Sequence, residues 1–463
     1  MKIYNTLTGR KQEFKPLEDN KVKMYACGIT VSGEAHIGHA YQALIYDIIR
    51  KYLEKVGYEV TYARNYTDVD DKIIAKSNQT GIPADEYARE MIKNIDEQML
   101  RLKVDEPSLW LKATESIEDI IAFVSTLIEK GHAYPTEKGD VYFSVESFPS
   151  YGKLSHRNLE DAMNGVRVDN DEMKKNPLDF ALWKSAKAGE PSWTSPWGEG
   201  RPGWHIECST MNRKAFGDQI DIHGGGRDLI FPHHENEIAQ TEALTGKQFA
   251  SFWIHNGLIK VNGQKMSKSL GNSLLLKDLL DKYSAETIKF ALLQTNYRGD
   301  INVTDNLFPD AEKHLYDFYS IICAVKKAFG EIEGQNEQID EQFNQAMSDD
   351  FNTALAISNL YGYFKSIKTK LSAGDKSASA DVSQIIKTYS LIGLFAENAE
   401  QFVAEYEKKN ACDIPSEVLA VAEERKLARA NKDWAKSDEL RDKLAGLGYI
   451  VKDSKDGYTL SKK

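Results

Sequence analysis

Two cysteines and one short histidine-rich run carry the residue types that bind a transition metal. Cys27 and Cys208 lie far apart in the chain, while His233 and Glu237 belong to the run His-His-Glu-Asn-Glu at 233–237. On a helix, residues four positions apart share a face, so His233 and Glu237 can contact one ion. Two thiolates, an imidazole and a carboxylate are all ligands that zinc accepts. The spacing fits no zinc finger, and the alternative is two buried free thiols beside a solvent-exposed helix face.

Two further motifs carry groups that bind phosphate. His-Ile-Gly-His occupies 36–39, and Lys-Met-Ser-Lys-Ser occupies 265–269 between glycines 263 and 271. Backbone amides and the positive end of the dipole at a helix N-terminus favour phosphate, and lysines on a mobile loop can close over it. The first motif alone is weak evidence, and the second alone could be an exposed turn. Together they predict a nucleotide-binding enzyme.

The residues around the first motif predict a strand, a helix and a second strand. Residues 21–27 alternate in polarity and end at Gly28, and residues 58–64 alternate in the same way. Between them, apolar residues at 44–53 recur with the spacing of an amphipathic helix. Such a unit buries a parallel sheet and places His36 and His39 at the helix N-terminus.

With these motifs together, the chain resembles the class I aminoacyl-tRNA synthetases, and specifically the cysteinyl-tRNA synthetase family. The resemblance runs from Tyr4 almost to the C-terminus. Further runs that carry it are Thr-Asp-Val-Asp-Asp-Lys at 67–72, Asp-Phe-Ala-Leu-Trp-Lys at 179–184, Ser-Pro-Trp-Gly at 195–198, Gly-Trp-His-Ile-Glu-Cys at 203–208 and Phe-Pro-His-His-Glu-Asn-Glu at 231–237. It implies an α/β fold in which a Rossmann-type catalytic domain with an insertion precedes an α-helical bundle and a small C-terminal anticodon-binding module.

The family resemblance also suggests domain boundaries. They are 1–115 for the first half of the catalytic domain, 116–199 for the connective insertion, 200–310 for the second half with the lysine motif, 311–410 for the helical bundle and 411–463 for the C-terminal module. The last of these contains a basic and aromatic cluster, formed by Arg425, Arg429, Lys432, Trp434, Lys436, Arg441 and Lys443. In the family, this helix belongs to the anticodon-binding module, whereas a solvated and salt-bridged face is the alternative.

The resemblance implies that L-cysteine is activated with ATP to cysteinyl-adenylate, releasing pyrophosphate, and is then transferred to the 3′ end of tRNA(Cys). Mg²⁺ accompanies the ATP. Catalysis of this kind is mainly positioning and stabilisation of negative charge. The catalytic candidates are His36, His39, Lys265 and Lys268. The ATP-binding candidates are His36, His39, Gly224, Gly226, Asp228 and Lys268.

Zinc would answer a selectivity problem for such an enzyme. Cysteine and serine differ by one atom, and a pocket that selects by shape separates such analogues by only about 1–3 kcal/mol. Zinc favours a thiolate over an alcohol. One zinc ion per subunit, held by Cys27, Cys208, His233 and Glu237, is therefore expected to select the substrate thiol. Four protein ligands fill a tetrahedral shell, so one ligand, most simply Glu237, must loosen or the shell must expand.

The amino-acid pocket and the cell compartment are expected from the resemblance and from composition. Thr67 and Trp204 match family positions that line the cysteine pocket, although Trp204 could also be a core residue. Four cysteines, no apolar signal core and no segment apolar enough to span a membrane predict a cytoplasmic enzyme without a membrane partner. We also expect the enzyme to be a monomer. The net charge of −11 does not exclude tRNA, because binding requires only a local basic surface.

Several positions depart from the family pattern. They are Ile29, the pair Ser32-Gly33, Tyr41 and the run Gly457–Leu460. These departures indicate a divergent or duplicate enzyme. Two alternatives stay open: a ligase of the mycothiol type, which transfers cysteine to an amino-sugar, and a non-catalytic paralogue. The C-terminal module disfavours the first alternative, and the intact histidine and lysine motifs disfavour the second.

Overall fold

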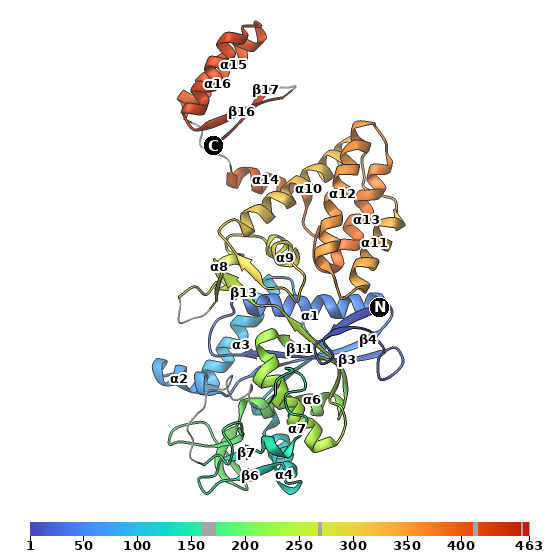
Figure 1. Cartoon of the computed structure of the whole chain (residues 1–463). Coiled ribbons are helices and arrows are strands. Elements are labelled where there is room, and N and C mark those ends of the chain that lie inside the picture. Colours follow the sequence, from blue (N-terminus) through green and yellow to red (C-terminus); the bar gives the residue numbers. More distant parts are fainter. Residues whose placement is uncertain (159–172, 267–270, 411–414, 455–456, 463) are drawn as a thin grey trace. The chain divides into compact units, whose positions relative to one another are not determined.

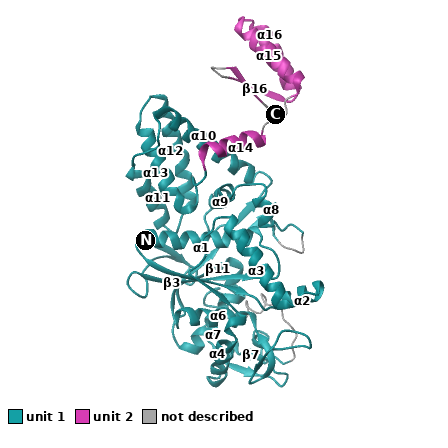
Figure 2. Cartoon of the chain, turned by 180° about the vertical axis from the view of Figure 1, so that it is seen from behind, with its two compact units in different colours: residues 1–397 teal, residues 398–463 magenta. Residues whose placement is uncertain are grey.

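The computed structural model describes residues 1–158, 173–266, 271–410, 415–454 and 457–462. The chain divides into two compact units, Met1–Glu397 and Asn398–Lys463, which Figure 2 shows in different colours. Among the described residues, no helix has both the length and the apolar character needed to cross a bilayer. The finer domain boundaries suggested above stay a prediction.

A five-stranded parallel sheet forms the centre of the first unit. Its strands are arranged in the order β12-β11-β3-β4-β5. Their bounds are Ala250–Asn256 for β12, Ile220–Gly226 for β11, Lys21–Thr30 for β3, Glu59–Thr67 for β4 and Leu109–Lys112 for β5. Parallel neighbours require crossover connections, so segments distant in the sequence meet at the carboxyl edge of this sheet.

Helices cover both faces of the sheet, as Figure 1 shows for α1 on one side and for α6 and α7 on the other. The helices around the sheet are α1 (Ile37–Lys55), α2 (Asp71–Thr80), α3 (Ala84–Arg101), α6 (Trp204–Phe216) and α7 (Glu235–Thr245). The α6 and α7 side packs through a core that includes Tyr25, Ala63, Met211 and Ile238. Coverage from both sides explains why residues 24–29 of β3 are continuously apolar, after the alternation of polarity at its start.

The predicted strand, helix and strand are confirmed. Both strands run three residues beyond their predicted ends, β3 to Thr30 and β4 to Thr67. The extension matters because it carries Thr67 to the carboxyl edge of the sheet. One glycine is required here for steric reasons, since a Cβ atom on Gly28 would lie 1.6 Å from the backbone oxygen of Asn65.

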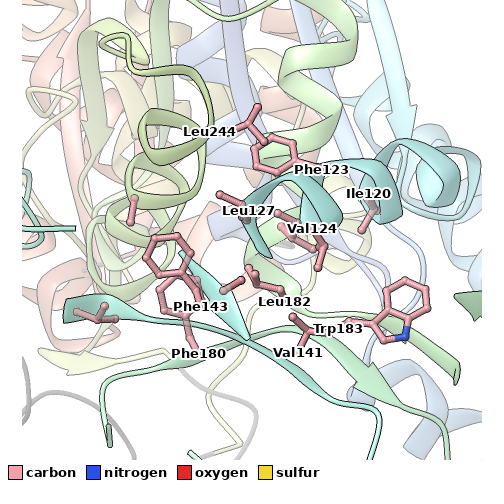
Figure 3. Close-up of a cluster of buried hydrophobic side chains, with 14 of the residues drawn as sticks. Ile120, Phe123, Val124, Leu127, Val141, Phe143, Phe180, Leu182, Trp183 and Leu244 are labelled. Atoms are coloured by element: carbon pink, nitrogen blue, oxygen red, sulfur yellow. The ribbon is translucent and has the colours of Figure 1, made fainter. Parts of the chain in front are cut away.

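An antiparallel sheet interrupts the central sheet in sequence. Its strand order is β6-β7-β8-β10-β9, and helix α4 (Ile117–Glu129) packs against it. The strands are β6 (Ala133–Pro135), β7 (Val141–Phe143), β8 (Phe180–Ser185), β9 (Trp193–Ser195) and β10 (Gly198–Pro202). Figure 3 shows the apolar core between them, where Phe143 and Phe180 stack at 5.0 Å beside Leu127 and Leu182.

Small strands and short helices link the central sheet to a helical region. The small strands are β1 (Lys2–Asn5), β2 (Arg10–Glu13), β13 (Ile259–Val261), β14 (Gln264–Lys265) and β15 (Ile301–Val303). The helices are α8 (Leu276–Leu280), α9 (Ala285–Leu293), α10 (Leu307–Phe329), α11 (Glu337–Ser348), α12 (Thr353–Ser372) and α13 (Ser377–Tyr389). Asp350 joins these parts, because its buried carboxylate accepts hydrogen bonds from Tyr4 N, Tyr297 Oη and Arg298 Nε.

The second unit begins with α14 (Ala399–Asn410) and ends in a helical hairpin and a two-stranded sheet. These elements are α15 (Ser416–Ala430), α16 (Trp434–Gly446), β16 (Tyr449–Ser454) and β17 (Gly457–Lys462). The basic and aromatic cluster is divided by its environment. Arg425 is 3% exposed and binds both carboxylate oxygens of Asp453, at 2.7 and 3.0 Å. Trp434 is 57% exposed with Arg429 over its ring. Arg425 therefore stabilises the unit, while Trp434 is available to a partner.

Candidate active site

The four predicted metal ligands meet at one point. Their candidate ligand atoms all lie within 4.8 Å of one another, and all four side chains are buried. The Cys27 sulfur lies 3.6 Å from the Cys208 sulfur and 3.4 Å from Glu237 Oε1, and His233 Nε2 lies 3.0 Å from the same oxygen. Both cysteines are free thiols. The alternative of a solvent-exposed helix face is wrong for His233 and Glu237.

Each ligand comes from a different element. Cys27 lies near the carboxyl end of β3, and Cys208 lies in α6. His233 belongs to a π-helical turn, Ile230–His234, which leads directly into α7, and Glu237 lies in the first turn of that helix. The prediction placed His233 and Glu237 on one regular helix. The structure instead widens the turn at His233, and the two side chains still meet.

Further histidines surround this quartet. His223 Nε2 lies 2.7 Å from Glu237 Oε2, and His234 Nε2 lies 3.3 Å from the Cys27 sulfur. His234 Nδ1 then lies 2.8 Å from a nitrogen of His255. Cys27, His223, His234 and Glu237 form a second set of four potential ligands within the same distance limit. His234 adjoins His233 in the histidine-rich run, whereas no spacing in the sequence relates His223 or His255 to the quartet.

The first quartet suits zinc better than the second set. It offers two thiols, which soft divalent metals prefer, whereas the second set offers one. His223 and His234 each contact a member of the first quartet, which is the usual place of residues that orient metal ligands. The first quartet also lies under Trp204, whose ring stacks on His233 at 4.4 Å.

The charges of the quartet are strongly coupled. A hydrogen bond from Cys27 lowers the pKa of Cys208 to about 6, while burial and then Cys208 raise the pKa of Cys27 well above its usual value. Burial disfavours charge on His233, yet Glu237 and Cys208 together outweigh burial and raise the pKa of His233 to about 10. Burial acts to raise the pKa of Glu237, but His223 and His233 hold it well below its usual range. A metal would require Cys27 and His233 to lose their protons, so binding would release protons.

Of the two predicted cysteine-binding residues, Trp204 contacts the quartet directly, and Thr67 contacts Glu207, the residue before Cys208. Trp204 is 38% exposed, so the interpretation of Trp204 as a core residue is wrong. Thr67 is buried, and its hydroxyl donates to Glu207 Oε2 at 2.9 Å. Burial, followed by the nearby Cys208, raises the pKa of Glu207 well above its usual range. Glu207 was not singled out from the sequence.

The histidine motif caps the first helix. His36 is the N-cap of α1, and its Nδ1 accepts from the amides of Gly38 and His39 at 3.1 and 3.4 Å. The His36 amide in turn donates to His39 Nδ1 at 3.4 Å, and the two rings stack with centroids 3.6 Å apart. Because Nδ1 of His36 is an acceptor, a neutral ring carries its proton on Nε2. That nitrogen is then a donor suited to a phosphate oxygen.

The lysine motif begins against the histidine motif. A Cβ atom on Gly38 would lie 3.5 Å from the terminal methyl of Met266. On the far side of the lysine motif, Ile37 N donates to Leu274 O, and Leu276 N donates to the carbonyl of Ala35. Both sides of the motif therefore contact the segment that carries His36 and His39. Lys265 is exposed in β14, and Lys268 lies outside the described residues.

The glycine run Gly224–Gly226 ends β11 at the same edge of the sheet. A Cβ atom on Gly224 would lie 2.3 Å from the buried Tyr46 hydroxyl, so its small size is already required by packing within the protein. A Cβ atom on Gly226 would lie 2.6 Å from the carboxylate of Asp228, and Asp228 is exposed. The structure therefore places Asp228 beside the run, next to the end of a strand where nucleotides bind in such sheets.

Comparisons with known proteins agree with this geometry. Residues 13–313 match the catalytic domain model of the class I (C) tRNA synthetases, residues 342–396 match the DALR domain, and residues 412–459 match the cysteinyl-tRNA ligase anticodon binding domain. The cysteine–tRNA ligase of Geobacter metallireducens is 45% identical to the chain over 480 residues and 99% of each protein. That of Caldicellulosiruptor saccharolyticus is 46% identical over 99% of this chain and 98% of its own length.

The chain belongs to the cysteine–tRNA ligase family.

Solved structures of other class I synthetases support the same fold. The methionyl-tRNA synthetase of Mycobacterium tuberculosis in complex with methionyl-adenylate has a TM-score of 0.62, covering 83% of this chain and 93% of that chain at 13% identity. The agnB2 LeuRS of Agrobacterium radiobacter K84 has a TM-score of 0.60 at 12% identity, covering 84% of this chain and 88% of that chain. The predicted fold class and family are thus confirmed. As a cysteine–tRNA ligase, the protein acts on ATP, an amino acid and tRNA.

Proposed function

We propose that this cysteine–tRNA ligase selects its amino acid through a zinc ion held by Cys27, Cys208, His233 and Glu237. The overall reaction joins L-cysteine to the 3′ end of tRNA(Cys) in two steps, through cysteinyl-adenylate with release of pyrophosphate. The observation that carries the proposal is the convergence of two thiols, an imidazole and a carboxylate within 4.8 Å. Zinc bound there would favour a thiolate ligand over an alcohol, which separates cysteine from serine.

The chain's own residues would keep the quartet in place. His223 bonds to one oxygen of Glu237 while the other oxygen faces Cys27 and His233. Glu237 is therefore the ligand we expect to give way to the substrate, because His223 already holds its second oxygen. Trp204 stacks on His233 and is 38% exposed, so it forms the part of the pocket that a substrate meets first.

The phosphates of ATP would lie between the histidine and lysine motifs. His36 offers Nε2 as a donor, and the exposed Lys265 lies near the point where Met266 touches Gly38. Lys268, His39, Gly224, Gly226 and Asp228 complete the proposed ATP site. Positive groups here would stabilise the charge that develops as the cysteine carboxylate attacks the α-phosphorus. Mg²⁺ would accompany the nucleotide.

Three further proposals concern the setting of the reaction. We expect the acceptor to be tRNA rather than an amino-sugar, since residues 412–459 match an anticodon binding domain. We also expect the protein to act as a monomer, and to do so in the cytoplasm, where tRNA is used. Size-exclusion chromatography with light scattering measures the oligomeric state, and fractionation of cells measures the compartment.

The zinc proposal is tested by Cys208→Ser. Removing one thiolate should lower the bound zinc from one ion per chain toward none, and cysteine-dependent exchange of pyrophosphate into ATP should fall with it. Cys323→Ser is the matched control, because Cys323 lies in α10, remote in the sequence from the quartet. Full zinc content and unchanged preference for cysteine over serine in Cys208→Ser would refute the proposal.

A further inference from the structure

A buried carboxylate lies beside the proposed cysteine pocket with no ionic partner among the described residues. Glu207 precedes Cys208 in α6 and is 1% exposed. Its Oε2 accepts from the Thr67 hydroxyl at 2.9 Å. Across the described part of the chain, no lysine, arginine or histidine forms an ion pair with it. Burial of a carboxylate is costly, so a residue kept there without a salt bridge calls for a functional explanation.

A line of buried polar groups connects Glu207 to the metal quartet. Asn65 Oδ1 lies 3.8 Å from the Cys208 sulfur and accepts from the Gly28 amide at 2.8 Å. Asn65 Nδ2 lies 3.5 Å from the Thr67 hydroxyl oxygen, which in turn contacts Glu207. Asn65, Thr67 and Glu207 are each no more than 3% exposed. These side chains therefore form one polar wall that starts at the thiols.

The hydrogen-bond directions along this wall determine what it can bind. A hydroxyl group has one proton and two lone pairs. The proton of Thr67 is given to Glu207, so toward any other group the Thr67 oxygen can act only as an acceptor. A ligand placed against Thr67 must therefore be a donor.

Bound cysteine carries such a donor at the required place. Two carbon atoms separate its sulfur from its α-ammonium group, so a thiol at the quartet keeps the ammonium close to the neighbouring wall. We propose that Glu207 is a positioning residue for the α-ammonium group of L-cysteine, acting through the Thr67 hydroxyl. This inference rests on the proposed function, because it assumes that the substrate sulfur lies at the quartet.

The test compares two thiols that differ only in the ammonium group. 3-Mercaptopropionate is cysteine without its amino group, so it retains the contacts of the thiol and the carboxylate. In zinc-loaded Glu207→Gln, the KM for cysteine in pyrophosphate exchange should rise about tenfold or more, as expected for a hydrogen bond to a charged group. The KM for ATP, the zinc content and the inhibition constant of 3-mercaptopropionate should stay unchanged.

Other outcomes separate the two proposals. An equal loss of affinity for cysteine and for 3-mercaptopropionate, or an unchanged KM for cysteine, overturns the role of Glu207. Absence of zinc-dependent inhibition by 3-mercaptopropionate in the unmodified protein overturns the zinc proposal instead. Glu286→Gln is the control, because Glu286 is also a buried carboxylate that accepts from a hydroxyl, that of Tyr319, outside this site.

The route through Thr67 is tested separately. Thr67→Val removes the hydroxyl with little change in shape and should cause the same selective rise in the KM for cysteine. The double variant with Glu207→Gln should be no worse than the more affected single variant, since both changes break one connection. If the fold-increase in the KM for cysteine in the double variant equals the product of the two single increases, Glu207 acts independently of Thr67. If Glu207→Gln does not fold, Thr67→Val still gives the comparison of the two thiols.

Discussion

Glu286 should make the stability of the first unit depend on pH. It lies in the first turn of α9 and is 2% exposed. Its carboxylate accepts from the Tyr319 hydroxyl at 2.9 Å and from the amides of Phe395 and Ala396 at 2.7 and 3.2 Å. Burial outweighs these hydrogen bonds and raises the pKa of Glu286 from 4.5 to about 7. The folded chain therefore holds this proton more tightly than the unfolded chain does.

The sign and size follow from linkage. A carboxyl whose pKa is raised by folding contributes stability that is fully present below pH 4.5 and is lost as pH rises through about 7. One pKa unit corresponds to about 1.4 kcal/mol, so the whole contribution is about 3.5 kcal/mol. Between about pH 5 and about pH 8, about 2.5 kcal/mol of it should disappear.

The effect is measured by urea unfolding of the unmodified protein and of Glu286→Gln at about pH 5 and about pH 8. Tryptophan fluorescence reports the fraction unfolded. The substituted amide cannot titrate, and it cannot accept from all of the donors around Glu286, so the variant should be the less stable protein under the acidic condition. Under the alkaline condition, the difference in unfolding free energy should shift in favour of the variant by about 2.5 kcal/mol. Parallel pH dependences of the two proteins would refute the reasoning.

Three other perturbations have definite expected outcomes. Lys268→Ala should abolish pyrophosphate exchange with unchanged zinc content, and full activity would refute its assignment to the ATP site. Gly28→Ala should prevent soluble expression, because the added Cβ would lie 1.6 Å from a backbone oxygen. Gly362→Ala has open space at its helical position, so its free energy of unfolding, measured by thermal unfolding, should rise by roughly 0.5–1 kcal/mol. Asp453→Asn should destabilise the second unit by about 1–3 kcal/mol because the buried Arg425 loses its charged partner; an unchanged melting temperature of that unit would contradict this.

The local pattern of the chain was sufficient for the elements around the histidine motif. Alternating polarity predicted β3 and β4, and apolar spacing predicted α1, since these periodicities depend only on backbone geometry. The cap of α1 was harder to predict, because histidine is not a favoured N-cap residue. His36 was assigned to that position through its motif rather than through capping preference.

The identities of the four quartet residues could also be chosen from the sequence, whereas their environment could not. Motif spacing says nothing about which strands are neighbours, so it could not place His223 of β11 and His255 of β12 around the quartet. The same limit applies to Arg425, which belongs to a basic helix in the sequence but is buried against Asp453 in the structure.

By itself, the sequence determined the family and the kinds of chemical group at the site, because residue types and short spacings carry that information directly. Only the tertiary structure decided which further groups surround the four predicted ligands. The parallel order β11-β3-β4 brings Cys27 and Thr67 to one edge of the sheet, and α6 sets Glu207 and Cys208 against them. Crossover connections bring together residues that lie far apart in the chain. Local periodicity in the sequence cannot predict these contacts.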